Sequence, residues 1–159
     1  MTMLTSAVIT GKGLLNVVGS LFNRLSLLVY IAEIHAKNKV ILATVKGDIH
    51  DIGKNIVKVL LENYSFDVID LGKDVPPEVI VDTAVEQDIR LVGLSALMTT
   101  TVVSMEETIK LLRERKPECK VMVGGAVLKQ DYADMIGADF YGKDAMQSVY
   151  YAQRVFEEE

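Results

Sequence analysis

The sequence predicts an α/β fold built on one five-stranded parallel sheet. Short apolar runs alternate five times with segments of helical periodicity, and the connections between them are short. The first run, Val40–Val45, reads VILATV and is rich in β-branched residues, as expected for a strand buried on both faces. Such alternation is typical of a parallel sheet with helices on both faces. Five strands favour the flavodoxin-like, or Rossmann-like, order 2-1-3-4-5 with right-handed crossovers.

Local sequence patterns predict each strand and helix along the chain. The apolar runs predicted as strands are Val40–Val45, Asp67–Gly72, Arg90–Ala96, Lys120–Gly125 and Asp139–Gly142. The first helix follows from the apolar residues at helical spacing, which are Ile52, Ile56, Val59 and Leu60. Two prolines suit the first turn of the second helix, Pro76–Asp88, and Val102–Arg115 carries charges at ion-pair spacing. A glycine stops a short helix within Lys129–Ala138, and Asp144 can cap the last helix, Ala145–Glu157.

The first 38 residues predict a short helical extension before an α/β domain at residues 39–159. Residues Leu14–Ile34 are rich in leucine and valine, but polar and charged residues interrupt them and leave too short a stretch for a membrane span. We therefore expect one or two amphipathic or buried helices there.

Composition narrows the function classes. The net charge is -5 with no basic face, so nucleic acid is not an expected partner. The single cysteine, Cys119, rules out an internal disulfide and fits a reducing compartment, so we expect a cytoplasmic protein without a membrane partner.

Candidate functional residues cluster in loops after the first, third and fourth strands. These loops contain Asp48 and His50, then Ser95–Thr100, then Gly124–Leu128. In a sheet of order 2-1-3-4-5, ligands bind beyond the carboxyl ends of the strands, at the switch between strands one and three. The three loops therefore predict one binding site.

Each of these residues also has a plainer interpretation. Asp48 or Asp51 could cap the helix that follows, and a lone histidine such as His50 is more often an ordinary loop residue than a ligand. Gly124 and Gly125 could form a simple loop or admit a bulky ligand to the backbone. The sequence lacks the motifs of three other kinds of site. It has no Walker loop for a nucleotide, no G-x-S-x-G elbow for a hydrolase and too few ligands for zinc. The third strand ends in a serine where a phospho-receiver domain needs aspartate.

Taken together, the three loops resemble a known family. DIHDIG (Asp48–Gly53) matches the D-x-H-x-x-G motif of cobalamin-binding domains, SAL (Ser95–Leu97) their S-x-L, and GGA (Gly124–Ala126) their G-G motif. The resemblance covers about Lys39–Phe156 and is to the cobalamin (vitamin B12)-binding domain of methionine synthase and corrinoid methyltransferase proteins.

This resemblance implies a cobalamin cofactor, methylcobalamin or another corrinoid. His50 would be the lower ligand of cobalt, Asp48 would hold its second ring nitrogen, and Thr101 stands where methionine synthases extend this relay with a serine. The dimethylbenzimidazole tail would enter a slot between the first and third strands. The expected catalytic residues are Asp48, His50 and Thr101. The expected cofactor-binding residues are Asp48, His50, Asp51, Ile52, Gly53, Ser95, Leu97, Thr99, Gly124, Gly125 and Ala126.

The implied function is a methyl carrier that shuttles a methyl group through Co(I) and methyl-Co(III) to a thiol acceptor such as homocysteine. It would be a component of a methyltransferase rather than a complete enzyme. It would need methyl-donor and methyl-acceptor methyltransferase domains or subunits, and it could use a reductive activation partner. The alternatives are a mutase-type or light-sensing cobalamin domain, or a flavodoxin-like domain without cobalamin.

The N-terminal segment departs from the family pattern. Family members carry a four-helix bundle ahead of the α/β part, and 38 residues are too few for four ordinary helices. The cap over the cofactor would then be incomplete, remodelled or supplied by another chain. Apolar surface on residues 14–34 makes a homo-oligomer a reasonable hypothesis.

Overall fold

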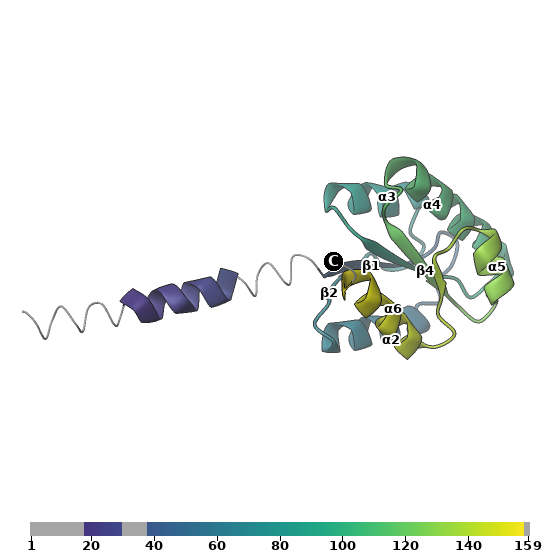
Figure 1. Ribbon diagram of the computed structural model, residues 1–159. Coiled ribbons are helices and arrows are strands. Elements are labelled where there is room, and N and C mark those ends of the chain that lie inside the picture. Colours follow the sequence, from purple (N-terminus) through teal and green to yellow (C-terminus); the bar gives the residue numbers. More distant parts are fainter. Residues whose placement is uncertain (1–17, 30–37, 158–159) are drawn as a thin grey trace, which may run out of the picture. The chain divides into compact units, whose positions relative to one another are not determined.

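The computed structural model describes residues 18–29 and 38–157 (Figure 1). Residues 38–157 form an α/β unit of five strands with five α-helices and one short 3-10 helix in the described range. The strands are β1 (Lys39–Thr44), β2 (Asp67–Asp70), β3 (Leu91–Ser95), β4 (Lys120–Gly124) and β5 (Phe140–Tyr141). The helices are α2 (Ile52–Asn63), α3 (Pro77–Glu86), η1 (Thr99–Thr101), α4 (Val102–Arg115), α5 (Gln130–Met135) and α6 (Ala145–Glu157).

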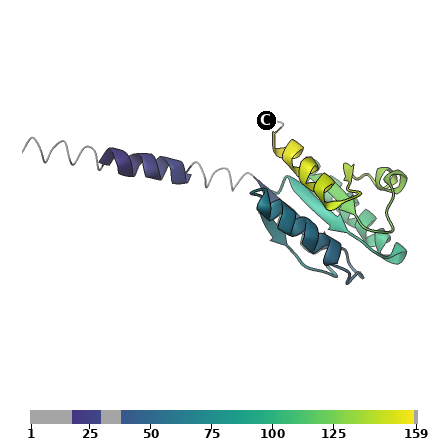
Figure 2. The ribbon, with the colours of Figure 1, turned by 90° about the horizontal axis from the view of Figure 1, so that it is seen from below.

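The sheet is parallel and its strand order is β2-β1-β3-β4-β5, which confirms the predicted order. Helices α3 and α4 cover one face and α2 and α6 cover the other (Figures 1 and 2). In the register, Thr44 of β1 lies opposite Ser95 of β3, and Ser95 lies opposite Gly124 of β4. The carboxyl ends of the three central strands therefore meet in one line, where the predicted site loops begin.

Alternate residues of the central strands pack into two separate hydrophobic cores, one on each face of the sheet. Ile41 and Ala43 of β1 pack under α3 and α4, whereas Val40 and Leu42 pack toward α2 and α6. This follows from the two-residue period of a strand, which sends successive side chains to opposite faces. The central strands are buried on both sides, so the uninterrupted apolar run at Val40–Val45 is explained.

Helix α2 turns a different face to the sheet from the one its apolar spacing predicts. Ile52 is 77% exposed, and Ile56 and Val59 are also more than half exposed. Leu60 does pack against the core, together with Val57 and Leu61. The first turns of α2 border a cavity beside the sheet at Gly53, Lys54 and Ile56 rather than packed side chains.

The N-terminal segment is described only in part. Residues 18–29 form a helix, whereas residues 1–17 and 30–37, which hold the rest of the predicted extension, lie outside the described residues. The boundary at residue 39 between this segment and the α/β domain stays a prediction. None of the helices in the described ranges has the length and apolar character needed to cross a membrane.

Candidate functional site

The loop after β1 is organised around a buried carboxylate. Asp48 is fully buried, and its Oδ1 accepts hydrogen bonds from the backbone N–H of His50 at 3.0 Å and from His50 Nδ1 at 2.8 Å. Its Oδ2 accepts bonds from the backbone N–H groups of Leu97 (2.6 Å) and Met98 (3.2 Å) and from the Thr101 hydroxyl (3.0 Å). Asp48 thus ties the loop after β1 to the loop after β3.

These contacts keep Asp48 ionised. Burial alone would raise the pKa of its carboxyl, but the hydrogen bonds from His50, Leu97 and Thr101 outweigh burial and hold the pKa far below its ordinary value. The five donors saturate the acceptor capacity of the carboxylate, which is the condition under which a buried charge is tolerated.

His50 presents one ring nitrogen to solvent. Because an ionised carboxylate only accepts hydrogen bonds, Nδ1 must carry the proton in the contact with Asp48. In the neutral ring, Nε2 then keeps its lone pair and is the nitrogen able to bind a metal. The His50 side chain is 47% exposed, so a ligand can reach it. A carboxylate behind a histidine is the usual support for a metal-binding imidazole.

Thr101 stands at the junction of η1 and α4. Its side-chain oxygen lies 3.0 Å from Asp48 Oδ2 and 2.8 Å from the Met98 carbonyl oxygen. A threonine hydroxyl has one proton, so it donates to one of these acceptors at a time. When it donates to Asp48, the chain of contacts from His50 through Asp48 to Thr101 is continuous. Thr99, two residues earlier in η1, makes no hydrogen bond with Asp48 within residues 38–157.

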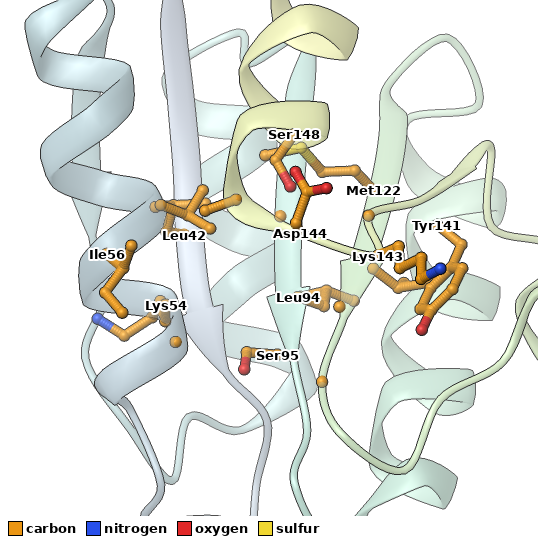
Figure 3. A pocket seen from close by; sticks show the side chains of 18 of the residues that line it. Leu42, Lys54, Ile56, Leu94, Ser95, Met122, Tyr141, Lys143, Asp144 and Ser148 are labelled. Atoms are coloured by element: carbon orange, nitrogen blue, oxygen red, sulfur yellow. The ribbon is translucent and has the colours of Figure 1, made fainter.

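Beside this loop, a cavity of about 360 Å³ lies between α2, the central strands and the start of α6 (Figure 3). Of the predicted cofactor residues, five line it: Gly53, Ser95, Gly124, Gly125 and Ala126. The others lie outside its wall. Leu97 is bound to Asp48 through its backbone, and Asp51 and Ile52 sit at the start of α2.

Two glycines shape this region. A Cβ on Gly93, in the middle of β3, would lie 2.5 Å from Leu42 Cδ2 and 2.8 Å from Met122 Cε. Gly125 has φ +143°, and a Cβ there would overlap the carbonyl oxygen of Ala96. A side chain at Gly125 is excluded by backbone, and one at Gly93 would have to displace the ends of Leu42 and Met122, so backbone and strand surface face the cavity. This shape fits a planar group inserted beside β3.

The capping interpretation of the aspartates is wrong for α2. Asp51 occupies the N-cap position but makes no side-chain capping bond. Both carboxylate oxygens of Asp48 accept the hydrogen bonds described above and do not cap α2. Asp144 does cap α6, because its Oδ1 accepts the backbone N–H of Gln147 at 2.9 Å.

Sequence reasoning missed one wall of the cavity. The connection from β5 to α6 contributes Lys143, Asp144, Ala145 and Ser148, and the deep part contains Leu42 and Met122. The strand order could have indicated this wall. In a parallel sheet the carboxyl end of β5 lies at the same edge as the ends of β3 and β4, so the segment after β5 is expected beside the site.

Residues 38–150 match the protein family described as the B12 binding domain. The chain belongs to this family. It is a cobalamin-binding domain, and cobalamin or a related corrinoid is its cofactor. The fold, the loop motifs and the cavity beside β3 agree with that membership, which excludes the alternative of a flavodoxin-like domain without cobalamin.

Similar curated relatives indicate which branch of the family the chain resembles. The chain is 46% identical over 112 residues to dimethylamine corrinoid protein 1 of Methanosarcina mazei, an alignment that covers 69% of this chain and 52% of that protein. The chain thus spans about half the length of such curated relatives. These relatives are not methionine synthases, so homocysteine, the acceptor that the resemblance implied, is not supported.

Two solved structures are similar over most of the α/β unit. One is a cobalamin-binding protein from Desulfitobacterium hafniense, with TM-score 0.73, 39% identity and coverage of 76% of this chain and 60% of that chain. The other is the methanol:cobalamin methyltransferase complex MtaBC from Methanosarcina barkeri, with TM-score 0.74, 32% identity and coverage of 77% and 48%. A response-regulator receiver domain from Geobacillus stearothermophilus, at 16% identity, shares the fold alone.

Proposed function

We propose that this chain is the corrinoid-binding part of a methyl-carrier protein and that His50 is the lower ligand of its cobalt. The observation that carries the proposal is the Asp48–His50 pair, with Nδ1 held at 2.8 Å and Nε2 left for a metal. The pair lies in the loop just before α2, whose first turn lines the cavity beside β3 at Gly53 and Lys54. The cofactor would supply the methyl transfer at cobalt. The chain would supply the axial ligand, its orientation and the binding slot.

The cavity beside β3 would hold part of the corrinoid. Its volume of about 360 Å³ and its lining by Ser95, Gly124 and Gly125 would suit the nucleotide base of the cofactor, which Ser95 would hydrogen-bond. His50 would remain available to hold cobalt.

The methyl donor is proposed to be a small methylated compound handled by a separate methyltransferase subunit. The names of the relatives support this. They include dimethylamine and trimethylamine corrinoid proteins, and a solved relative is a methanol:cobalamin methyltransferase complex. The chain would therefore act as a carrier between partners, with Asp48 and Thr101 tuning how strongly His50 binds.

A visible spectrum tests the proposal. Purified protein is mixed with methylcobalamin beside a His50→Ala variant, with His35→Ala as the control for loss of the other histidine. The wild type and the control should give the spectrum of histidine-ligated cobalt, and His50→Ala should give the spectrum of cobalt without a nitrogen ligand. Identical spectra for all three proteins would refute the assignment of His50.

A further inference from the structure

The loop after β2 lies beside the loop that carries the proposed cobalt ligand. The backbone N–H of Thr44 donates to the Gly72 carbonyl oxygen at 2.9 Å, and the backbone N–H of Val75 donates to the Thr44 carbonyl oxygen at 3.1 Å. Val45 and Val75 also form a parallel bridge. The segment between Gly72 and Val75 is therefore fixed to the chain that leads from β1 into the site.

Asp74 of this segment holds the main chain on both sides of the Gly47–Asp48 peptide bond. Its Oδ1 accepts the backbone N–H of Gly47 at 2.7 Å, and its own backbone N–H donates to the carbonyl oxygen of Asp48 at 3.0 Å. Asp48 is thus held twice. The loop after β3 binds its carboxylate, and Asp74 binds its carbonyl oxygen.

The backbone of this contact is unusual in both partners. Asp74 has φ +56° and Gly47 has φ +85°. Among residues other than glycine, aspartate and asparagine adopt such a left-handed conformation most readily. Position 74 therefore has two requirements, a positive φ and a side-chain acceptor for the Gly47 N–H. Glycine meets only the first of them.

We infer that Asp74 is a positioning residue for His50 and sets how firmly the imidazole is presented to cobalt. It would act through Asp48 rather than by binding the metal. Asp48 Oδ1 accepts both the ring Nδ1–H and the backbone N–H of His50, so a shift of the Asp48 main chain moves the whole histidine. This inference rests on the proposed function, because it requires His50 to bind cobalt.

Two substitutions at this position separate the side-chain acceptor from the backbone conformation. Asp74→Gly keeps the positive φ and the backbone bond and removes only the acceptor of the Gly47 N–H. Its dissociation constant for methylcobalamin, measured by spectroscopic titration of the full chain, should rise roughly fivefold, the worth of one net hydrogen bond. The fraction of histidine-ligated cobalt in the visible spectrum should fall. Asp74→Asn keeps an acceptor oxygen and should bind nearly as tightly as wild type.

Asp88 provides the matched control. It is another aspartate with positive φ, +50°, and its carboxylate accepts a hydrogen bond from Lys116 Nζ at 2.6 Å. It lies between α3 and β3, at the edge of the sheet opposite the site. Asp88→Gly should therefore leave both the affinity and the spectrum unchanged.

A double-variant cycle distinguishes positioning from a general loosening of the fold. In the His50→Ala background no imidazole remains to be positioned, so adding Asp74→Gly should leave the dissociation constant unchanged. An equal loss of affinity in both backgrounds would overturn the inference, and so would wild-type affinity and spectrum in Asp74→Gly alone. Equal defects in Asp74→Asn and Asp74→Gly would show that the acceptor oxygen is not what matters.

The same measurements keep the two proposals apart. If His50→Ala has the spectrum of wild type, the proposed function fails and this inference fails with it. If His50→Ala loses histidine ligation while Asp74→Gly does not, only the inference fails. Thermal unfolding checks each variant, and Asp74→Ser, whose acceptor is shorter, replaces Asp74→Gly if that variant does not fold.

Discussion

Asp48 Oδ1 lies 2.8 Å from His50 Nδ1 and 3.0 Å from the backbone nitrogen of the same residue. One carboxylate oxygen therefore fixes both the ring and the main chain of His50. The other oxygen holds the loop after β3. The orientation of the proposed cobalt ligand is thus determined by contacts between two loops that are 49 residues apart in sequence.

Replacing Asp48 by asparagine should damage both stability and histidine ligation. Each group that contacts the Asp48 carboxylate donates a hydrogen bond to it. The side-chain NH2 group of asparagine would therefore face a donor and leave hydrogen bonds unmade. We expect Asp48→Asn to lose about 2 kcal/mol of the free energy of unfolding. Urea denaturation of the cofactor-free protein measures this loss. A visible spectrum with methylcobalamin should show weaker histidine ligation, and an unchanged spectrum would count against the coupling.

Gly125 and its neighbour Gly124 form a matched pair. A Cβ on Gly125 would overlap the Ala96 carbonyl oxygen, whereas one on Gly124 would lie at an ordinary 3.5 Å from the Gly142 carbonyl oxygen. We expect Gly125→Ala to destabilise the fold by about 2 kcal/mol or more, because it combines overlap with a strained φ. Gly124→Ala should cost clearly less. Equal losses in thermal unfolding would contradict this geometry.

Lys54 is a buried cation on the first turn of α2. Its Nζ lies 2.5 Å from Asp70 Oδ1 at the end of β2 and 2.8 Å from Asn55 Oδ1. Because Lys54→Met would leave Asp70 partly buried without its main partner, we expect a loss of about 2 kcal/mol in the free energy of unfolding. The double variant Lys54→Met/Asp70→Asn should recover part of that loss. If the double variant is as unstable as the sum of the two single variants, the pair is not coupled.

Acid should destabilise the fold through Asp139. Burial alone would raise the pKa of this carboxyl, but hydrogen bonds from Arg113 and the backbone of Val121 lower it below its ordinary value of 3.8. A lowered folded-state pKa contributes stability above the unfolded-state pKa, and that stability is lost as pH falls through the folded-state value. We expect Asp139→Asn to lose about 1 kcal/mol at pH 7 and to show a smaller decline than wild type below pH 4. Urea denaturation across pH 2–7 tests this expectation.

Much of the architecture was predictable because it follows from local periodicity. The apolar run at Val40–Val45 and the helix at Val102–Arg115 are visible without tertiary information, and the five-fold alternation of strands and helices favoured the sheet order that the structure has. The three motif loops were predictable for the same reason, since parallel strands bring their carboxyl ends to one edge.

The orientation of α2 and the far wall of the cavity were not predictable in this way. Lys54 is buried and paired with Asp70, which comes from another element. Ile52 and Ile56 of the same helix are exposed, so the apolar periodicity alone indicated the wrong inward face. Ser148 sits in an ordinary helical segment, and its position in the cavity appears only once α6 is packed against α2.

The cavity beside β3 would also link the lifetime of the chain to the supply of its cofactor. A space of about 360 Å³ within the folded unit lacks the packing contacts that filled cores provide. A molecule that fills it binds the folded state alone and raises the free energy of unfolding as its concentration exceeds the dissociation constant. Chains without cofactor would unfold more often and be degraded first. The amount of this protein in a cell would then follow corrinoid availability without any dedicated regulator.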